Sequence, residues 1–372
     1  MQKRRLGRTE LIVSCIGLGA GSRMFMGRYH QGSDTPHAVI NRALDEGINF
    51  IDTARSYYKS EKIVGEVIKG RRDECFLASK TYLRKGSQVM KDIDISLKNL
   101  QTDRIDLYQI HNVVYKNELN TVLKSKGALG TLKKAKGEGK LNYIGITAFH
   151  PEIIKECIQT DEFDTIQIPF NFSEITQIGE IFDLAKKFDV GIIIMRPLSG
   201  GEVNSAEGAL KFILGYDVSI VIPGCSTVEH VQINARVGKN LVELPVEKRE
   251  KLFLDIIEGT FCRGCKLCEP VCPVGISVSE IFHYETYLYF NATYARSEYR
   301  RFSRRISTCI DCGECEKLCP YNLPIRVMLK RADRRLKRGI IEDIIVNLLR
   351  RLQLYSRARE LYFDLGLPLP KR

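Results

Sequence analysis

Eight of the twelve cysteines follow one pattern twice in the last third of the chain. In each copy three cysteines are separated by two residues, and a fourth comes after three more, directly before proline: Cys262, Cys265, Cys268 and Cys272, then Cys309, Cys312, Cys315 and Cys319. Three such thiolates can hold one face of a 4Fe-4S cube, and the fourth cysteine commonly binds the neighbouring cluster. The pattern predicts two clusters, one bound by Cys262, Cys265, Cys268 and Cys319, the other by Cys309, Cys312, Cys315 and Cys272.

Two other interpretations of these cysteines are less favoured. A structural zinc site also uses pairs separated by two residues, but zinc needs no third evenly spaced cysteine. Disulfides are not expected, because no signal peptide is visible at the start of the chain. The remaining cysteines, Cys15, Cys75, Cys157 and Cys225, are scattered, as expected of reduced thiols in a cytoplasmic protein.

Length and charge favour two domains with different surfaces. A chain of 372 residues with 44% hydrophobic residues can bury a large core, and no long uncharged apolar run indicates a membrane span. Lys and Arg number 36 against 33 Asp and Glu in residues 1–258, and 21 against 12 in residues 259–372. A basic final third could bind an acidic electron-transfer partner, an anionic membrane surface or nucleic acid, or could simply be a solvated face around negatively charged clusters.

Before the first cysteine motif, β-branched runs alternate with amphipathic helical patterns. Eight strands are expected, at residues 11–16, 48–52, 75–79, 105–111, 143–147, 165–168, 190–195 and 219–222. Helices are expected at residues 36–45, 61–69, 87–100, 119–136, 151–160, 175–188, 206–214 and 227–239. Eight such units in about 250 residues predict an α/β fold, a (β/α)8 TIM barrel. The glycine-rich segment 17–21 lacks the spacing of a dinucleotide fingerprint and is expected to be a flexible loop.

The cysteine motifs mark a second domain. Their spacing is typical of bacterial ferredoxins, but residues 276–305 between them have a helical pattern in place of a short β-rich stretch. We therefore expect a mainly α-helical ferredoxin-like domain. The expected organisation is a barrel in residues 1–258, the two-cluster domain in residues 259–324 and a basic helical extension in residues 325–372, with helices at 325–336 and 340–351.

Polar side chains stand where three of the predicted barrel strands end. Asp52 ends the second strand and Tyr57 follows in the next loop, Lys80 follows the third strand, and His111 ends the fourth. Because the carboxyl ends of barrel strands meet at one face, these four side chains are expected to converge. Each alone has an ordinary structural explanation, but the combination indicates a site for acid–base chemistry.

The residue types suggest how such a site could protonate an alkoxide. A carbonyl that accepts hydride needs a proton, which Tyr57 can donate if its pKa, ordinarily about 10, is lowered. A buried Lys80 ammonium would lower it, and Asp52 would keep that ammonium charged and oriented. His111 would polarise the carbonyl oxygen as a second donor.

These residues and their surroundings resemble the aldo-keto reductases. The strings FIDTARSYYKSE (50–61) and DLYQIH (106–111), together with RLGRT (5–9) and IPGCS (222–226), are similar to that family over residues 1–258. The remainder resembles the ferredoxin extension of one branch of the family. The resemblance implies that Asp52, Tyr57, Lys80 and His111 form the catalytic tetrad, and the spacing of five residues after Asp52 selects Tyr57 over Tyr58.

The resemblance also implies a nicotinamide pocket. Its carboxamide contacts correspond to Thr147 and Gln167, the position that stacks on the nicotinamide ring reads Met195, and Pro197 and Leu198 follow. At the adenosine end the corresponding residues are Gly224, Ser226, His230 and Asn234. Gly224 and His230 stand where the family commonly has the Lys and Arg that bind a 2'-phosphate, so NAD(P)H is the expected cofactor and the sequence does not decide between NAD and NADP. Ser226 and the following helix N-terminus could hold a phosphate through N–H groups, and NAD or a flavin nucleotide remains an alternative.

The leading hypothesis is an iron–sulfur oxidoreductase that reduces a small carbonyl compound, or oxidises an alcohol, in the barrel and exchanges electrons through two clusters. Nicotinamide moves two electrons as hydride whereas each cluster moves one, so direct coupling would ordinarily require a flavin between them. The alternatives are an NAD(P)H carbonyl reductase with structural clusters, and a non-catalytic redox sensor or electron-transfer subunit. We expect an acidic ferredoxin-like electron donor as a partner, and neither nucleic-acid binding nor a membrane span.

Overall fold

The computed structural model describes residues 1–22, 25, 34–171, 178–198, 205–242, 262, 265–301 and 306–337. The described residues form two compact units, one made of residues up to 242 and the other of residues from 262 onward. The domain boundary expected after residue 258 lies outside the described residues. Among the described residues, no helix combines the length and the apolar composition that a membrane span requires.

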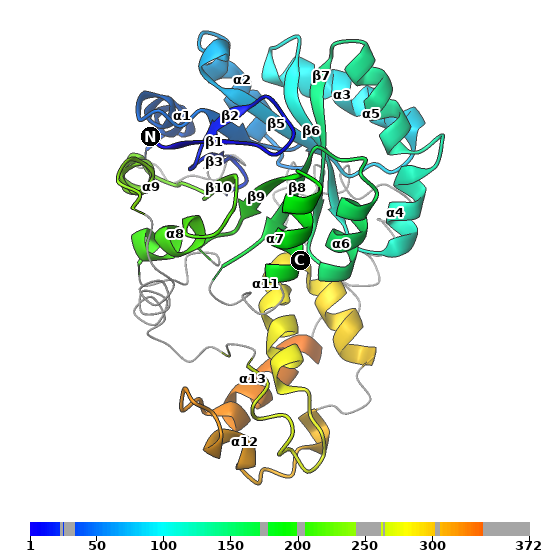
Figure 1. Cartoon of the computed structure of the whole chain (residues 1–372), viewed down its shortest axis with the longest axis vertical. Helices are drawn as coiled ribbons and strands as arrows, with labels where there is room; N and C mark the ends of the chain where they lie inside the picture. Colours follow the sequence, from blue (N-terminus) through cyan, green and yellow to red (C-terminus); the bar gives the residue numbers. More distant parts are fainter. Residues whose placement is uncertain are drawn as a thin grey trace. The chain divides into compact units, whose positions relative to one another are not determined.

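The first unit is built around eight parallel strands. In chain order they are β3 (Leu18–Gly19), β4 (Phe50–Asp52), β5 (Phe76–Thr81), β6 (Ile105–Val113), β7 (Leu141–Ala148), β8 (Thr165–Pro169), β9 (Gly191–Met195) and β10 (Ile220–Ile222). Each strand pairs with its sequence neighbour, and bridges between Ile16 and Val221 and between Gly19 and Gly224 join the two edges. The sheet thus closes into the expected barrel, with helices around it (Figure 1).

The helices of this unit follow the strands in alternation. They are α1 (Pro36–Asp45), α2 (Ser60–Ile68), α3 (Gly86–Leu100), α4 (Lys116–Leu123), α5 (Ala128–Gly137), α6 (Pro151–Gln159), α7 (Ile178–Lys187), α8 (Ala206–Leu214) and α9 (Val228–Lys239), with a short 3-10 helix η1 (Arg72–Glu74). Each α-helix buries one apolar stripe, as Val39, Ile40 and Leu44 do on α1.

The single helix expected over residues 119–136 was wrong, because two helices occupy this segment. The chain extends at Lys124, and α5 begins after Gly127. A Cβ on Gly127 would lie 2.3 Å from the carbonyl oxygen of Thr121 and 2.4 Å from that of Val122. The close approach of backbone to backbone ends α4, which a helical pattern of apolar residues does not reveal.

The first predicted strand was also wrong. Within residues 11–16, Ile12–Ser14 form β2, which pairs antiparallel with β1 (Lys3–Arg5) in a hairpin, and Ile16 makes the bridge to Val221. The first barrel strand is β3, inside the glycine-rich segment that we expected to be a flexible loop. A Cβ on Gly19 would lie 2.8 Å from the carbonyl oxygen of Ile222, so the barrel closure requires glycine here, and Leu18 is the one residue of this short strand with an apolar side chain.

The hairpin covers the end of the barrel where the strands begin. Leu6, Leu11 and Val13 pack with inward-facing residues of the strands, including Phe50 and Leu107. Gly7, between β1 and β2, has a φ of 56°, and a Cβ there would lie 2.0 Å from the nitrogen of Gly191, the first residue of β9. Glycine is required at this contact. The packed base leaves the opposite end of the barrel for chemistry.

The second unit is helical, as expected. Its elements are α11 (Val278–Arg301), η2 (Ile306–Thr308), α12 (Glu314–Lys317) and α13 (Ile325–Lys337). Helices α11 and α13 pack together, with Glu285 bound by Arg331 and Arg335, and with Tyr299 donating to Asp333. The predicted helix over residues 340–351 lies outside the described part of the chain.

Candidate active site and cysteine cavities

An apolar layer supports the polar residues inside the barrel. On three neighbouring strands a buried apolar residue stands two positions before a buried polar one: Phe50 before Asp52, Ala78 before Lys80, and Leu107 before Gln109. Because side chains alternate along a strand, both members of each pair face the interior. The register pairs Asp52 with Ala78 and Lys80 with Gln109, which brings the polar side chains together above the apolar ones.

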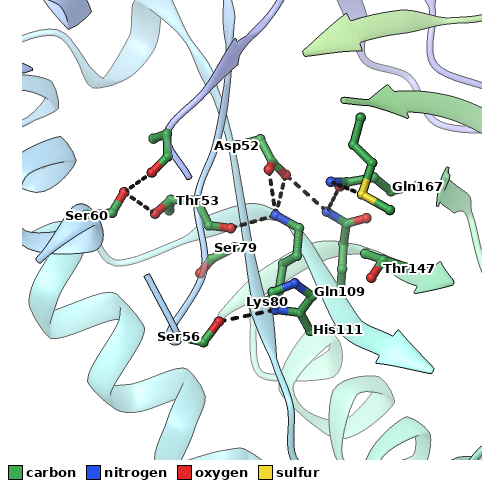
Figure 2. A network of polar contacts seen from close by, with 12 residues as sticks. Asp52, Thr53, Ser56, Ser60, Ser79, Lys80, Gln109, His111, Thr147 and Gln167 are labelled. Atoms are coloured by element: carbon green, nitrogen blue, oxygen red, sulfur yellow. Dashed lines mark hydrogen bonds and ion pairs between the residues drawn. The ribbon is translucent and has the colours of Figure 1, made fainter. Parts of the chain in front are cut away.

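A buried ion pair forms the centre of this polar layer. The Nζ atom of Lys80 lies 2.6 Å from both carboxylate oxygens of Asp52, and it donates to the carbonyl oxygen of Thr53 at 2.8 Å (Figure 2). Lys80 is 0% exposed and Asp52 is 2% exposed. Burial raises the pKa of the Asp52 carboxyl, while the Lys80 ammonium and the amides of Gln167 and Gln109 oppose that rise. The pair is thus a cation held in place by a bidentate carboxylate.

Tyr57 lies over this cation. The Lys80 Nζ atom is 5.3 Å from the centroid of the Tyr57 ring. On another side, a Cβ on Gly21 would lie 3.0 Å from Cε2 and 3.1 Å from Cζ of Tyr57, so the glycine after β3 makes room for the phenol. Tyr57 and Tyr58, the rival phenol, are both half-buried, and Tyr58 has a φ of 49°.

His111 completes the predicted tetrad. Its ring meets the Tyr57 ring edge to face, with centroids 5.7 Å apart, and stacks on the Tyr82 ring, with centroids 4.2 Å apart. Its Nδ1 atom is 3.4 Å from Oγ of Ser56 (Figure 2). The structure therefore brings Asp52, Tyr57, Lys80 and His111 to one place at the carboxyl ends of β4, β5 and β6.

A bulge in β6 positions His111. The pairing of β6 with β7 shifts register between Ile110 and Val113, and Asn112 has a φ of 54°. The buried guanidinium of Arg84 donates to the carbonyl oxygens of His111 and Asn112, both at 2.9 Å. The Asn112 N–H donates to Oγ1 of Thr147 at 2.6 Å. A β-bulge can turn a side chain in a new direction, and the bulge of β6 turns His111 toward Tyr57 and Tyr82.

Sequence reasoning missed four residues of this site: Ser56, Tyr82, Arg84 and Gln109. Tyr82 could have been found, because it stands two positions after Lys80 and alternation along an extended segment gives both side chains the same direction. Arg84 gave no such signal, since its partners are carbonyl groups of another strand.

The residues expected to contact nicotinamide lie in β7, β8 and the end of β9. The Oε1 atom of Gln167 accepts from Nε2 of Gln109 at 2.8 Å, and its Nε2 lies 3.7 Å from Sδ of Met195. Thr147, as described, accepts from the β6 bulge. Pro197 is buried and Leu198 is half-buried directly after β9. Thr147 and Gln167 are thus engaged with other parts of the barrel.

Three N–H groups at the start of α9 and just before it donate to side chains of this chain. At the start of α9 the carboxylate of Asp34 accepts from the Val228 N–H at 2.8 Å, and Oγ1 of Thr227 accepts from His230 N at 3.1 Å. The Nδ1 atom of His230 accepts in turn from Ser226 N at 3.3 Å. Gly224 is exposed beside this loop.

Asn234 lies in the middle of α9, on its buried side. It is 2% exposed, and its Nδ2 atom donates to Sγ of Cys225 at 3.2 Å. Burial raises the pKa of the Cys225 thiol to about 12. Asn234 therefore fastens the loop to the helix in this structure.

The cysteines of the second unit line two separate cavities. One cavity is lined by Cys262, Cys265, Cys268 and Cys319, and the other by Cys272, Cys309, Cys312 and Cys315. In each cavity three cysteines come from one motif and the fourth from the other motif. Four thiols are the donor set of a 4Fe-4S cluster, so the residues of each cavity fit that group.

The walls of the two cavities differ. Ile325 of α13 lines the first, and Arg326 and Leu329 of the same helix line the second. Described residues from 325 onward therefore belong to the cysteine-rich unit. Burial, together with neighbouring Cys262, raises the pKa of the Cys268 thiol to about 12. In the second cavity the Ile276 N–H donates to Sγ of Cys272 at 3.3 Å.

Two family models match the chain. The model of the aldo/keto reductase family matches residues 17–208, and that of a 4Fe-4S dicluster domain matches residues 261–324. The second match favours clusters over the zinc alternative, and neither match supports a flavin in the barrel.

Individual proteins agree with the first match. The aldo-keto reductase YhdN of Bacillus subtilis is 31% identical over 217 residues, which are 54% of this chain and 63% of that relative. The chain thus spans less than two thirds of that relative's length. The methylglyoxal reductase YeaE of Escherichia coli is 24% identical over a region that covers 65% of this chain and 91% of that relative.

A solved structure supports the fold. The holo form of aldo-keto reductase AKR11C1 from Bacillus halodurans has a TM-score of 0.57 and 23% identity, covering 70% of this chain and 98% of that one. At this identity the likeness concerns the barrel alone. The tetrad geometry, the closed barrel and the two family matches lead to one conclusion: this chain belongs to the aldo/keto reductase family and carries a C-terminal 4Fe-4S dicluster domain.

Proposed function

We propose that this protein reduces a small carbonyl compound with a nicotinamide nucleotide in the barrel, or oxidises the corresponding alcohol. The observation that carries the proposal is the fully buried Lys80 ammonium, 2.6 Å from both oxygens of Asp52 and 5.3 Å from the centre of the Tyr57 ring. A buried cation beside a phenol favours the phenolate and so makes the phenol a better acid. The small carbonyl substrate named for the methylglyoxal reductase relative agrees with this substrate class.

Each residue of the tetrad has a separate role in the proposed reaction. A nicotinamide nucleotide, when bound, supplies hydride to the carbonyl carbon. Tyr57 donates its Oη proton to the carbonyl oxygen, and Lys80 stabilises the phenolate that remains. His111, fixed by Tyr82 and by the bulge of β6, donates a hydrogen bond to the same oxygen as charge develops on it. Asp52 keeps Lys80 charged.

Replacing Tyr57 by Phe removes the proton donor and leaves the ring in place. We expect the turnover number to fall about 100-fold or more, because general acid catalysis contributes about 10²–10⁴-fold, while the affinity for nucleotide changes little. Steady-state kinetics with a panel of small aldehydes and nucleotide titration by fluorescence measure the two effects. Tyr58→Phe is the matched control and should retain activity. Equal turnover for wild type and Tyr57→Phe would contradict the role.

The start of α9 supports a preference for NADH over NADPH. Its N–H groups face Asp34, Thr227 and His230, and one of these partners is a carboxylate. Phosphate sites in barrels commonly lie at a helix N-terminus after the last strands. A 2'-phosphate arriving there would meet the negative charge of Asp34, whereas the uncharged ribose hydroxyl of NADH would not.

Replacing Asp34 by Asn removes this charge and retains an oxygen that can accept from the Val228 N–H. We expect the ratio of kcat/KM for NADH to that for NADPH to fall about tenfold, which corresponds to about 1.4 kcal/mol, mainly through tighter NADPH binding. Glu229→Gln, which removes an exposed carboxylate from the first turn of the same helix, should change the ratio less. An unchanged ratio in Asp34→Asn would remove Asp34 as the determinant.

In the second unit we propose that each cavity holds one 4Fe-4S cluster, with the fourth ligand exchanged between motifs. Cys265 and Cys312, one from each cavity, are exposed, which supports electron exchange with a one-electron carrier at either cluster. The basic character of residues 259–372 supports an acidic, ferredoxin-like carrier whose binding weakens as salt increases. Clusters with a purely structural role are the competing proposal. Steady reduction of the clusters by a one-electron carrier would distinguish electron-transferring clusters from structural ones.

The other cysteines support a reducing compartment. Cys15, Cys75, Cys157 and Cys225 are buried free thiols. Such thiols are ordinary in the cytoplasm, which we propose as the location.

Pairs of cysteine substitutions test the exchange of ligands. Full-length protein reconstituted without oxygen should hold about eight irons per chain, and Cys272→Ser alone about four. Cys272→Ser combined with Cys309→Ser should still hold about four, because both ligands belong to one cluster, whereas Cys272→Ser combined with Cys262→Ser should hold almost none. Iron analysis and electron paramagnetic resonance measure this, with Cys225→Ser as the control. The reverse result for the two double variants would show that the ligands are not exchanged.

A further inference from the structure

One buried amide of the barrel has no part in the chemistry described above. Gln109 lies in β6, two residues before His111, and is 0% exposed. Its Nε2 atom lies 2.8 Å from Oε1 of Gln167 and 3.4 Å from Oδ2 of Asp52 (Figure 2). One amide group therefore connects the carboxylate of the tetrad with a residue expected to face nicotinamide.

The orientation of this amide is determined by its neighbours. Both groups next to Nε2 are acceptors, one of them a carboxylate, so the reversed amide would place oxygen against oxygen. In the described part of the chain, Oε1 of Gln109 is buried without a hydrogen-bond partner. The amide is therefore held by its NH2 group.

The barrel also makes room for this side chain. Gly145 is the residue paired with Gln109 in β7, and a Cβ there would lie 3.0 Å from Cγ and 3.2 Å from Oε1 of Gln109. The same Cβ would lie 2.4 Å from Oγ1 of Thr165. A glycine at this position lets the long amide lie across the barrel interior toward Asp52 and Gln167.

We propose that Gln109 is a positioning residue for both halves of the reaction, fixing the Asp52 carboxylate on Lys80 and orienting the amide of Gln167 toward nicotinamide. This inference rests on the proposed function. A hydrogen bond to the ionised carboxylate favours that form, so losing the donor shifts the proton of the pair from Lys80 toward Asp52. The charge beside Tyr57 then weakens, and the phenol becomes a poorer acid.

The test uses Gln109→Met, which retains the length of the side chain and removes the donor. In full-length protein with its clusters, tyrosines labelled with ¹³C at Cζ are titrated by nuclear magnetic resonance, and the Tyr57 signal is assigned from Tyr57→Phe. We expect Tyr57 to titrate below the ordinary value of about 10 in wild type and closer to it in Gln109→Met. The KM for NADH should rise about tenfold, and the alkaline limb of the pH profile of kcat/KM should move to higher pH.

Ser96→Ala is the matched control. Its Oγ is 3.2 Å from the hydroxyl of Tyr108, so the variant breaks a buried hydrogen bond to the same strand without touching Asp52. It should leave the Tyr57 titration unchanged. If Gln109→Met fails to fold, the double variant Gly145→Ala with Thr165→Ala keeps Gln109 in the sequence and displaces its amide group from Asp52. The pKa of Tyr57 should then shift in the same direction as in Gln109→Met.

The outcomes separate this inference from the proposed function. Tyr57 titrating at the ordinary value in wild type would overturn both. Tyr57 titrating low in wild type and equally low in the folded Gln109→Met variant, with an unchanged KM for NADH, would overturn the role of Gln109 alone.

Discussion

The burial of one charge, the Lys80 ammonium, constrains the rest of the barrel. An ion removed from water costs several kcal/mol unless partners replace its hydration. Here both oxygens of Asp52 and the carbonyl oxygen of Thr53 do so, at 2.6–2.8 Å. These partners come from β4 and its following residue, while Lys80 belongs to β5. The arrangement requires the two strands to keep their register, because a shift of one residue would turn Lys80 out of the barrel and leave Asp52 unpaired.

The polar layer extends outward from this pair in two directions. Through Gln109 it reaches Gln167 and Met195, and toward the barrel mouth it reaches Tyr57 and His111. Below it lies an apolar layer that the β1–β2 hairpin covers. A desolvated charge with fixed neighbours acts strongly on a nearby phenol, since the low dielectric around it screens little. The catalytic proposal depends on this weak screening of the Lys80 charge.

The sequence predicted the features that depend on local pattern. Seven of the eight barrel strands, the helices around them and the helical second unit follow from β-branched runs and amphipathic periodicity. The first strand was missed because it is only two residues long and its Gly19 packs against the opposite edge of the sheet. The break at Gly127 was missed because it depends on a contact between backbone atoms. The tetrad could be located at strand ends, but Gln109, Arg84 and Asp34 could not, since their partners lie on other elements far along the chain. Hydrogen bonds across the barrel leave no trace in residue spacing.

If the site around Lys80 directs hydride transfer between nicotinamide and a carbonyl, the hydrogen that reaches the carbonyl carbon comes from C4 of the nucleotide. Full-length protein with its clusters is given small aldehydes, without oxygen, and NADH carrying deuterium at each C4 position of nicotinamide in turn. The product alcohol is then analysed by mass spectrometry. We expect one deuterium on the carbinol carbon from one of the two positions, and a rate about 100-fold lower in Lys80→Met. Alcohol formed without deuterium from either position, or an equal rate in Lys80→Met, would contradict it.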